Sequence, residues 1–255
     1  MFPETLLMRL SVAHAFGHVG LPAGRFSRTA ERDTEKIAAL RALQRLFADQ
    51  HFPAAAHPAE LLWQRDALGK PAIDWQGGLA DWAASRQLCA RHLHVSNTHD
   101  GPLHLVLAAY EPGLLGVGVD LVYLPRLRRP GKDADYLRRL ATRFMSVQEW
   151  QAFTAASHGE DEEALRVRVA AHFSLMEAAS KALGTGLRLA MRGARPLALP
   201  PRALGVSRLR PEVRLLLGPE AEARRQALRG GECAGDWAVC GEYLISAVVL
   251  WRSRE

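Results

Sequence analysis

Cysteine is scarce in this chain of 255 residues, which contains only Cys89, Cys233 and Cys240. An odd, sparse set of cysteines argues against a disulfide framework, and the lack of a Cys-x-x-Cys pair argues against a cysteine metal site. We therefore expect three free thiols.

Long apolar runs are absent as well. No segment approaches the ~20 consecutive apolar residues of a membrane-spanning helix, and the first residues, MFPETLLMR, lack the basic and apolar parts of a secretory signal. These absences predict a cytoplasmic protein without a membrane partner. Hydrophobic residues make up 48% of the chain, which allows a sizeable core.

The charge balance is basic, with a net charge of +6 and a pI of 9.6. Such a balance suits an anionic partner, namely nucleic acid, a phosphate-rich cofactor or an acidic protein. Because the arginines are spread along the chain and no nucleic-acid-binding motif occurs, we expect no nucleic-acid partner. A nucleic-acid-binding protein stays an alternative that only the charge suggests.

Hydrophobic periodicity predicts strands and a helix in the first half. We expect a strand over residues 6–16, a helix from Thr29 to Phe47 and a short strand over 61–66 that ends before the GKP turn. Residues 93–110 hold two apolar stretches around a polar Asn-Thr-His-Asp-Gly stretch, which predicts a strand, a turn and a second strand.

The second half partly repeats this order. A β-rich segment over 114–124 is followed by helical patterns over 136–145 and 146–153, a long helix over 164–186 that glycines end, and a hairpin over 237–251. The sequence therefore predicts an α+β fold of two similar halves, residues 1–112 and 113–255.

Asp120 lies inside the apolar stretch GVGVDLVYL. Strand interiors disfavour aspartate, and a buried carboxylate needs a partner. The alternative is a strand-end aspartate that faces solvent or an arginine. The neighbouring glycines favour the functional interpretation, because they let a bulky ligand approach the backbone.

Glu177 and Lys181 lie four residues apart on the predicted long helix, a spacing that is also typical of a surface ion pair. Their neighbours are mostly apolar, so a metal or a phosphate is the better reason for these two charges. Three further groups have ordinary interpretations when each is taken alone. His99 and Lys70 suit turns, and the basic helix start with Arg32 and Lys36 suits a solvated face.

The order of these motifs resembles that of the Sfp-type 4'-phosphopantetheinyl transferases. The matching segments are GKP (69–71), SNTHDG (96–101), GVD (118–120), FSLMEAASK (173–181) and GTGL (184–187). RFMSVQEW resembles the family's segment that ends in an acidic residue, here Glu149. The resemblance covers most of the chain, and the family folds as two similar α+β halves.

The resemblance implies that the chain moves the phosphopantetheine arm of coenzyme A onto a serine of a carrier protein and releases 3',5'-ADP. It implies Mg²⁺ held by Asp120 and Glu177, and catalytic roles for Glu177, Lys181 and Glu149. It also implies a set of coenzyme A contacts, a monomer, and a carrier surface within residues 147–163. The acidic loop GEDEE (159–163) fits an acidic carrier poorly, so we expect the docking face to avoid it. The implied coenzyme A contacts are Lys70, Thr98, His99, Lys181, Arg32 and Lys36.

Two positions depart from the family pattern. Met176 stands where the family has a lysine, and Val122 stands where many members have a second acid. A methionine cannot contact a phosphate, so Met176→Lys is expected to hold or raise activity. The alternative is a degenerate member that binds coenzyme A or a carrier without efficient transfer. The identity of the carrier, and Mn²⁺ in place of Mg²⁺, stay open.

Overall fold

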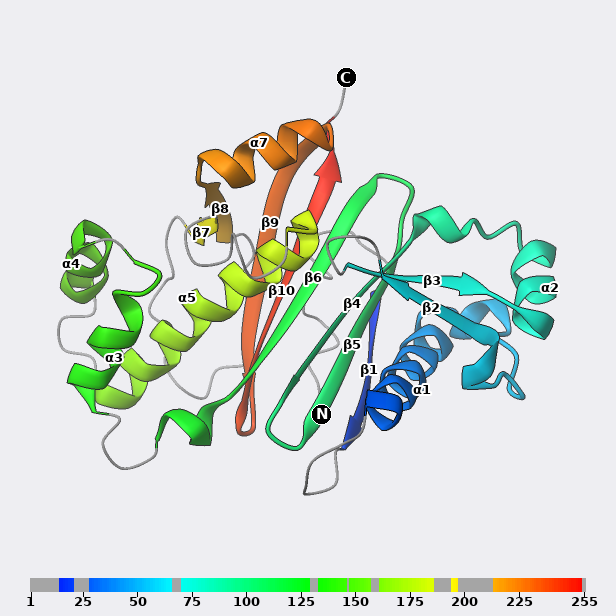
Figure 1. Ribbon diagram of the computed structural model, residues 1–255, viewed down its shortest axis with the longest axis horizontal. Helices are drawn as coiled ribbons and strands as arrows, with labels where there is room; N and C mark the ends of the chain where they lie inside the picture. The colour runs from blue at the N-terminus through cyan, green and yellow to red at the C-terminus, as the bar shows by residue number, and fades with distance from the viewer. Residues whose placement is uncertain are drawn as a thin grey trace.

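The computed structural model contains both helices and strands in each half, and it describes residues 14–20, 28–65, 70–128, 133–145, 147–156, 161–185, 194–196 and 213–253 (Figure 1). This mixture confirms the predicted α+β class. Within the described ranges, no helix combines the length and the apolar character that crossing a membrane requires.

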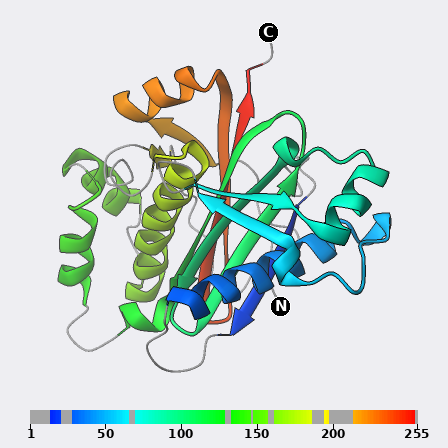
Figure 2. The same ribbon diagram turned by 45° about the vertical axis from the view of Figure 1, so that its right-hand side comes forward.

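The first half contains a three-stranded antiparallel sheet in the order β1-β5-β4 and a separate β2-β3 hairpin. Figure 2, in which this half is turned forward, shows α1 lying across its strands. Ala38, Ala42 and Leu43 of α1 pack on Val106 and Ala108 of β5. The elements are β1 (His14–Gly20), α1 (Arg28–Leu46), β2 (Leu61–Arg65), β3 (Pro71–Trp75), α2 (Gly77–Ser85), β4 (Leu93–Asp100) and β5 (Leu103–Tyr110).

The second half contains a five-stranded sheet in the order β6-β10-β9-β8-β7, with the long helix α5 against it (Figure 1). The short helices α3 and α4 pack beside the first part of α5, and α7 lies near β9. The elements are β6 (Leu114–Tyr123), α3 (Ala134–Ala141), α4 (Val147–Ala156), α5 (Glu162–Leu183), β7 (Ala194–Pro196), β8 (Val213–Leu217), α7 (Pro219–Ala227), β9 (Gly230–Cys240) and β10 (Tyr243–Arg252).

The two halves repeat one topology. In each half the first strand pairs with the last, which pairs with the one before it, giving β1-β5-β4 and β6-β10-β9. The helix contacts repeat as well. A Cβ added to Gly17 would lie 1.8 Å from the carbonyl oxygen of Ala38 in α1, and one added to Gly118 would lie 1.8 Å from that of Ala178 in α5. The division at residues 112 and 113 stays a prediction.

Most predicted elements are confirmed, among them α1, α5 and the closing hairpin β9-β10. Residues 6–13 of the first predicted strand lie outside the described residues. Helices α2 and α7 and strand β3, which starts at Pro71 directly after the predicted GKP turn, were not predicted.

The predicted polar turn is wrong in its extent, because Asn97 to Asp100 continue strand β4 and only Gly101 and Pro102 connect it to β5. Polar side chains are compatible with this strand because they find partners in other elements. Asn97 donates to Glu35 of α1 at 2.6 Å, and Thr98 donates to Asp120 of β6 at 3.2 Å.

The two sheets meet in two places. They share an apolar layer, and β4 lies along the edge of β6 that has no neighbour among the described strands of its own sheet. Leucines of β5, such as Leu105 and Leu107, pack on Val117, Val119 and Ile245. β6 is an edge strand, so its outward amides lack a backbone partner.

Side chains of β4 accept hydrogen bonds from those outward amides. The amide of Val119 donates to Ser96 Oγ at 3.0 Å, and the amide of Tyr123 donates to Asp100 Oδ2 at 2.7 Å. Side chains of the first half thus satisfy the edge of the second half.

The close approach of α5 to β6 predicts that Gly118→Ala is strongly destabilising. The added methyl group would overlap the backbone of Ala178, and overpacking of this kind costs about 1–3 kcal/mol or more. The matched control is Gly20→Ala, because a Cβ at Gly20 meets nothing within 4 Å. Chemical denaturation of both variants measures the effect. Equal free energies of unfolding for Gly118→Ala and the parent would contradict the packing.

Candidate functional site

Asp120 lies on edge strand β6 with its side chain toward α5, the same face as Gly118. Only 7% of the residue is exposed. Its Oδ1 atom accepts hydrogen bonds from Thr98 Oγ1 at 3.2 Å and from Lys181 Nζ at 3.0 Å. The carboxylate is therefore buried at the junction of the two halves, with one partner from each.

Helix α5 supplies the second carboxylate. Asp161 caps its first turn by accepting from the amide of Ala164 at 2.7 Å, and Gly184 ends it in the left-handed conformation. Glu177 is 7% exposed. Burial, the larger cause, and the charge of Asp120 together raise the pKa of Glu177 to about 7, and Lys181 opposes the shift. Asp120 and Glu177 are thus near enough to repel each other.

Lys181 reaches across to β6. Its Nζ donates to the carbonyl oxygen of Val119 at 2.8 Å and to Asp120 Oδ1 at 3.0 Å. The geometry therefore differs from the ordinary surface ion pair that the spacing of Glu177 and Lys181 also allowed.

The glycines of β6 have a different role from the one expected. Gly116 and Gly118 admit the backbone of α5, since added Cβ atoms would lie 2.1 Å from the oxygen of Ala182 and 1.8 Å from that of Ala178. The prediction that they make room for a ligand is wrong at these positions. They bring the helix close enough for Lys181 to contact the strand.

A second polar group lies in the first half, where β4 and β5 face α1. The ring of His99, which is exposed, stacks on that of His104 with centroids 5.9 Å apart. His104 is buried, and burial lowers its pKa to about 4. Glu35 of α1 accepts from Arg65 of β2 and from Asn97, both at 2.6 Å.

The sequence analysis missed Glu35, Arg65, Asn97 and His104. A signal existed only for Glu35, an acid among the apolar positions of its helix. Arg32 is exposed and Lys36 is half-buried on α1, as expected for a basic helix start.

Lys70, from the first half, lies at the C-terminal end of α5. Its Nζ donates to the carbonyl oxygen of Leu115 at 3.1 Å and is 3.5 Å from that of Ala182. The ammonium group thus lies near the carbonyl of Ala182 at the C-terminal end of the helix, where the helix dipole favours a cation. This contact ties the first half to α5 at a second point.

Some predicted residues lie outside the described part of the structure. Glu149 is a position of α4, but its side chain is not described, so its role stays a prediction. The same holds for Gly186 and Leu187 of the GTGL motif.

Met176 is buried in the cluster that joins α3 and α4 to α5, with 2% of its surface exposed. Its neighbours in that cluster include Phe144, Met145 and Phe153. The methionine therefore has a packing role, which the sequence analysis did not anticipate.

Asp120 and Glu177 form a donor set that fits a hard divalent cation. Magnesium is commonly held by one or two carboxylates and completes its coordination with phosphate oxygens and water. Across the described residues, no group of three His, Cys, Asp or Glu side chains gathers in a metal-binding arrangement. Asp120 and Glu177 are the two residues of this site that would hold such a cation.

The raised pKa of Glu177 predicts a pH-dependent effect of Glu177→Gln on stability. Between the ordinary value of 4.5 and about 7, the folded protein keeps a proton that the unfolded chain releases. Parental stability therefore falls as pH rises through this window, and the glutamine variant lacks that loss. We expect its melting temperature to exceed the parent's at about pH 8, with a smaller difference at about pH 5.

Thermal unfolding at both pH values checks this expectation. The control is Glu232→Gln, which changes an exposed glutamate on β9. A Glu177→Gln difference that is the same at both pH values would contradict the assignment.

The burial of Met176 predicts that Met176→Lys destabilises the protein by more than about 2 kcal/mol, because the ammonium group would enter an apolar cluster. Met176→Leu keeps the volume and is expected to cost less than about 1.5 kcal/mol. Urea denaturation compares the two variants. A lysine variant as stable as the parent would show that the side chain can reach solvent.

Solved structures of three acyl-carrier-protein synthases resemble this chain. The Neisseria meningitidis holo-[acyl-carrier-protein] synthase is 21% identical, with a TM-score of 0.41, and the match covers 55% of this chain and 99% of that one. The Helicobacter pylori enzyme in complex with coenzyme A is 18% identical, with a TM-score of 0.36 and coverage of 52% and 98%. For the Chronobacterium ammoniagenes ACPS-CoA complex the values are 22%, 0.31, 56% and 100%.

Residues 116–238 match the family model of the 4'-phosphopantetheinyl transferase superfamily. No curated protein matches the chain. The matched segment is just under half of the chain, runs from β6 into β9 and includes Asp120, Glu177 and Lys181. Over this segment, the family match confirms the resemblance drawn from the motifs.

Proposed function

We propose that the protein transfers the 4'-phosphopantetheine group of coenzyme A to a serine of a carrier protein and releases 3',5'-ADP. The family match supports transfer of this kind. The observation that carries the proposal is that Asp120 lies buried between Thr98 and Lys181, beside Glu177. This cluster combines two carboxylates with an ammonium group, the charges that a reaction on a pyrophosphate needs.

Glu177 is the proposed general base. In the metal-free protein, burial and the charge of Asp120 raise the pKa of Glu177 to about 7. Glu177 would accept the proton of the carrier serine as the hydroxyl oxygen attacks the β-phosphate of coenzyme A. With Mg²⁺ bound to this carboxylate, a water molecule on the metal would be the alternative acceptor of the serine proton. Glu149 is the second candidate for this role or for orienting a water molecule.

Asp120 and Glu177 are the proposed ligands of Mg²⁺, which would supply positive charge to the pyrophosphate when bound. Mn²⁺ suits the same oxygen ligands. Lys181 would neutralise charge on the leaving phosphate. Its ammonium group lies 3.0 Å from the carboxylate of Asp120, one of the two proposed metal ligands.

The first half is proposed to hold the nucleotide part of coenzyme A. Thr98 of β4 contacts Asp120, whereas the next residue, His99, projects from the opposite face and stacks on His104. Arg32 and Lys36 of α1 offer charge for the 3'-phosphate. Lys70 completes the predicted set, although its described contacts are with backbone carbonyls. Arg65, which Glu35 holds at 2.6 Å, joins this set, since 44% of its side chain is exposed.

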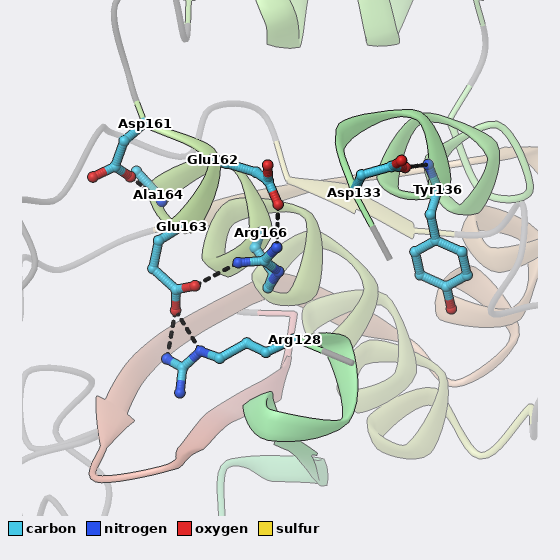
Figure 3. A network of polar contacts seen from close by, with 8 residues as sticks. All are labelled: Arg128, Asp133, Tyr136, Asp161, Glu162, Glu163, Ala164 and Arg166. Carbon is cyan, nitrogen blue, oxygen red and sulfur yellow. Dashed lines mark hydrogen bonds and ion pairs between the residues drawn. The ribbon is translucent and has the colours of Figure 1, made fainter. Parts of the chain in front are cut away.

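The carrier is proposed to approach over α4 and the start of α5, where the acids are already paired. Figure 3 shows Glu163 between Arg128 and Arg166, and Glu162 also bonded to Arg166. This pairing reduces the repulsion that an acidic carrier would meet. We further propose that the enzyme acts as a cytoplasmic monomer, since one chain contains both halves.

The proposal predicts that Asp120→Asn and Glu177→Gln each lower the transfer rate at least about 100-fold, because each removes a charge at the reacting phosphate. The assay incubates the enzyme with coenzyme A, Mg²⁺ and an apo-carrier, and reads the mass of the carrier. Asp81→Asn, on an exposed face of α2, is the matched control and should keep the parental rate. Circular dichroism checks that each variant is folded.

Transfer by either site variant at near the parental rate would refute the assigned roles. A parent protein that modifies no apo-carrier, across fatty-acid, polyketide and peptide-synthetase types, would instead support the degenerate alternative. Binding of coenzyme A without transfer distinguishes that alternative from a wrong assignment of the site.

A further inference from the structure

Two buried serines lie beside the Asp120 carboxylate without being part of the expected site. Ser246 is directly opposite Asp120 in the β10-β6 pairing, so both side chains project from the same face of the sheet. Side chains in such cross-strand pairs have Cβ atoms about 4.5–5.5 Å apart. The hydroxyl of Ser246 is therefore on the same face of the sheet as the carboxylate, one strand away, without a hydrogen bond between them.

Ser174 of α5 is the helix residue whose position along α5 matches that of Asp120 along β6. Ala182 of α5 lies over Gly116 of β6, and Ala178 lies over Gly118. Four helix residues advance about 6 Å, nearly as far as two strand residues. The next step along both elements places Ser174 over Asp120.

Both hydroxyls are isolated from solvent and from other partners. Ser174 and Ser246 have exposed fractions of 0%, and neither Oγ atom has a hydrogen-bond partner among the described residues. The surroundings are apolar, with Leu175, Ala178 and Val248 in the adjoining core. Buried hydroxyl groups are normally hydrogen-bonded, because an unpaired one loses its bonds to water. Two such groups on either side of one carboxylate need an explanation.

We propose that Ser174 and Ser246 are positioning residues that hold the Asp120 carboxylate from its core side. This inference rests on the proposed function, in which Asp120 binds the metal. Thr98 and Lys181 both donate to Oδ1. In the metal-free protein the two serine hydroxyls have no partner within the part of the chain that the structure describes. They would donate to the other carboxylate oxygen, Oδ2, once a cation is bound at Asp120. Hydrogen bonds of this kind orient a ligating carboxylate and tune its affinity for the metal.

A purely structural role makes a different prediction for alanine variants. If the hydroxyls are only buried polar groups, Ser246→Ala and Ser174→Ala leave stability unchanged or raised and have no effect on metal binding. If they position Asp120, stability is again unchanged or raised, but metal affinity falls. The separation of stability from metal affinity therefore tests the proposal without reference to turnover.

The experiment measures Mn²⁺ binding by electron paramagnetic resonance on the full chain with saturating coenzyme A. We expect the dissociation constant for Mn²⁺ to rise about tenfold in Ser246→Ala and in Ser174→Ala. Thermal unfolding without metal should match or exceed the parent. The matched control is Ser180→Ala, a buried serine of α5 six residues on, roughly 240° around the helix from Ser174.

Dissociation constants within about twofold of the parent in both variants would overturn the proposal while leaving the proposed function intact. An equal rise in Ser180→Ala would also overturn it, since the effect would then be general to buried serines of α5. A parent protein that binds no Mn²⁺ with coenzyme A present would overturn the metal assignment and this inference together.

Discussion

The structure depends on how side chains of β4 satisfy the open edge of β6. An edge strand presents amides without backbone partners, and here Ser96 and Asp100 accept hydrogen bonds from two of them. Thr98, between these two residues, turns to the Asp120 carboxylate. One strand therefore both joins the halves and contributes to the site. Loss of this seam would separate Asp120 from a hydrogen-bond donor and expose an edge at the same time.

The position of helix α5 follows from a second constraint, the glycines of β6 beneath it. Because Gly116 and Gly118 have no side chains, α5 lies directly on β6. Lys181 then reaches the strand backbone, and Glu177 is enclosed near Asp120. The raised pKa of Glu177 is thus a result of the burial that this close backbone packing produces. The same packing brings Ser174 of α5 close to β6, where Ser246 of the neighbouring strand β10 is paired with Asp120.

The sequence was informative where local pattern and tertiary structure agree. Helical spacing located α1 and α5, and the apolar run around Asp120 located β6. The pairing of Asp120 with Glu177 was anticipated by resemblance, since nothing in the spacing of residues 120 and 177 brings them together.

The sequence failed where long-range partners decide the outcome. The stretch from Asn97 to Asp100 has the composition of a turn, yet its side chains find acceptors and donors on α1 and β6, and it remains a strand. Met176 reads as a missing phosphate contact in a motif, but it packs against α3 and α4, which the motif does not contain. Arg65 and Glu35 lie 30 residues apart, and their ion pair has no local signature.

The repeated topology shows which residues of the first half correspond to the acidic residues of the second. Superposing Gly17 on Gly118 and Ala38 on Ala178 places Val19 where Asp120 lies, Ile37 where Glu177 lies and Arg41 where Lys181 lies. Arg41 even donates to the carbonyl oxygen of His18, as Lys181 does to that of Val119. The first half thus has a basic side chain at the position of Lys181 and aliphatic side chains at the positions of both acids. At the positions that match Asp120 and Glu177, the first half therefore has no carboxylate, so the acidic pair occurs in only one of these two matched strand-and-helix units.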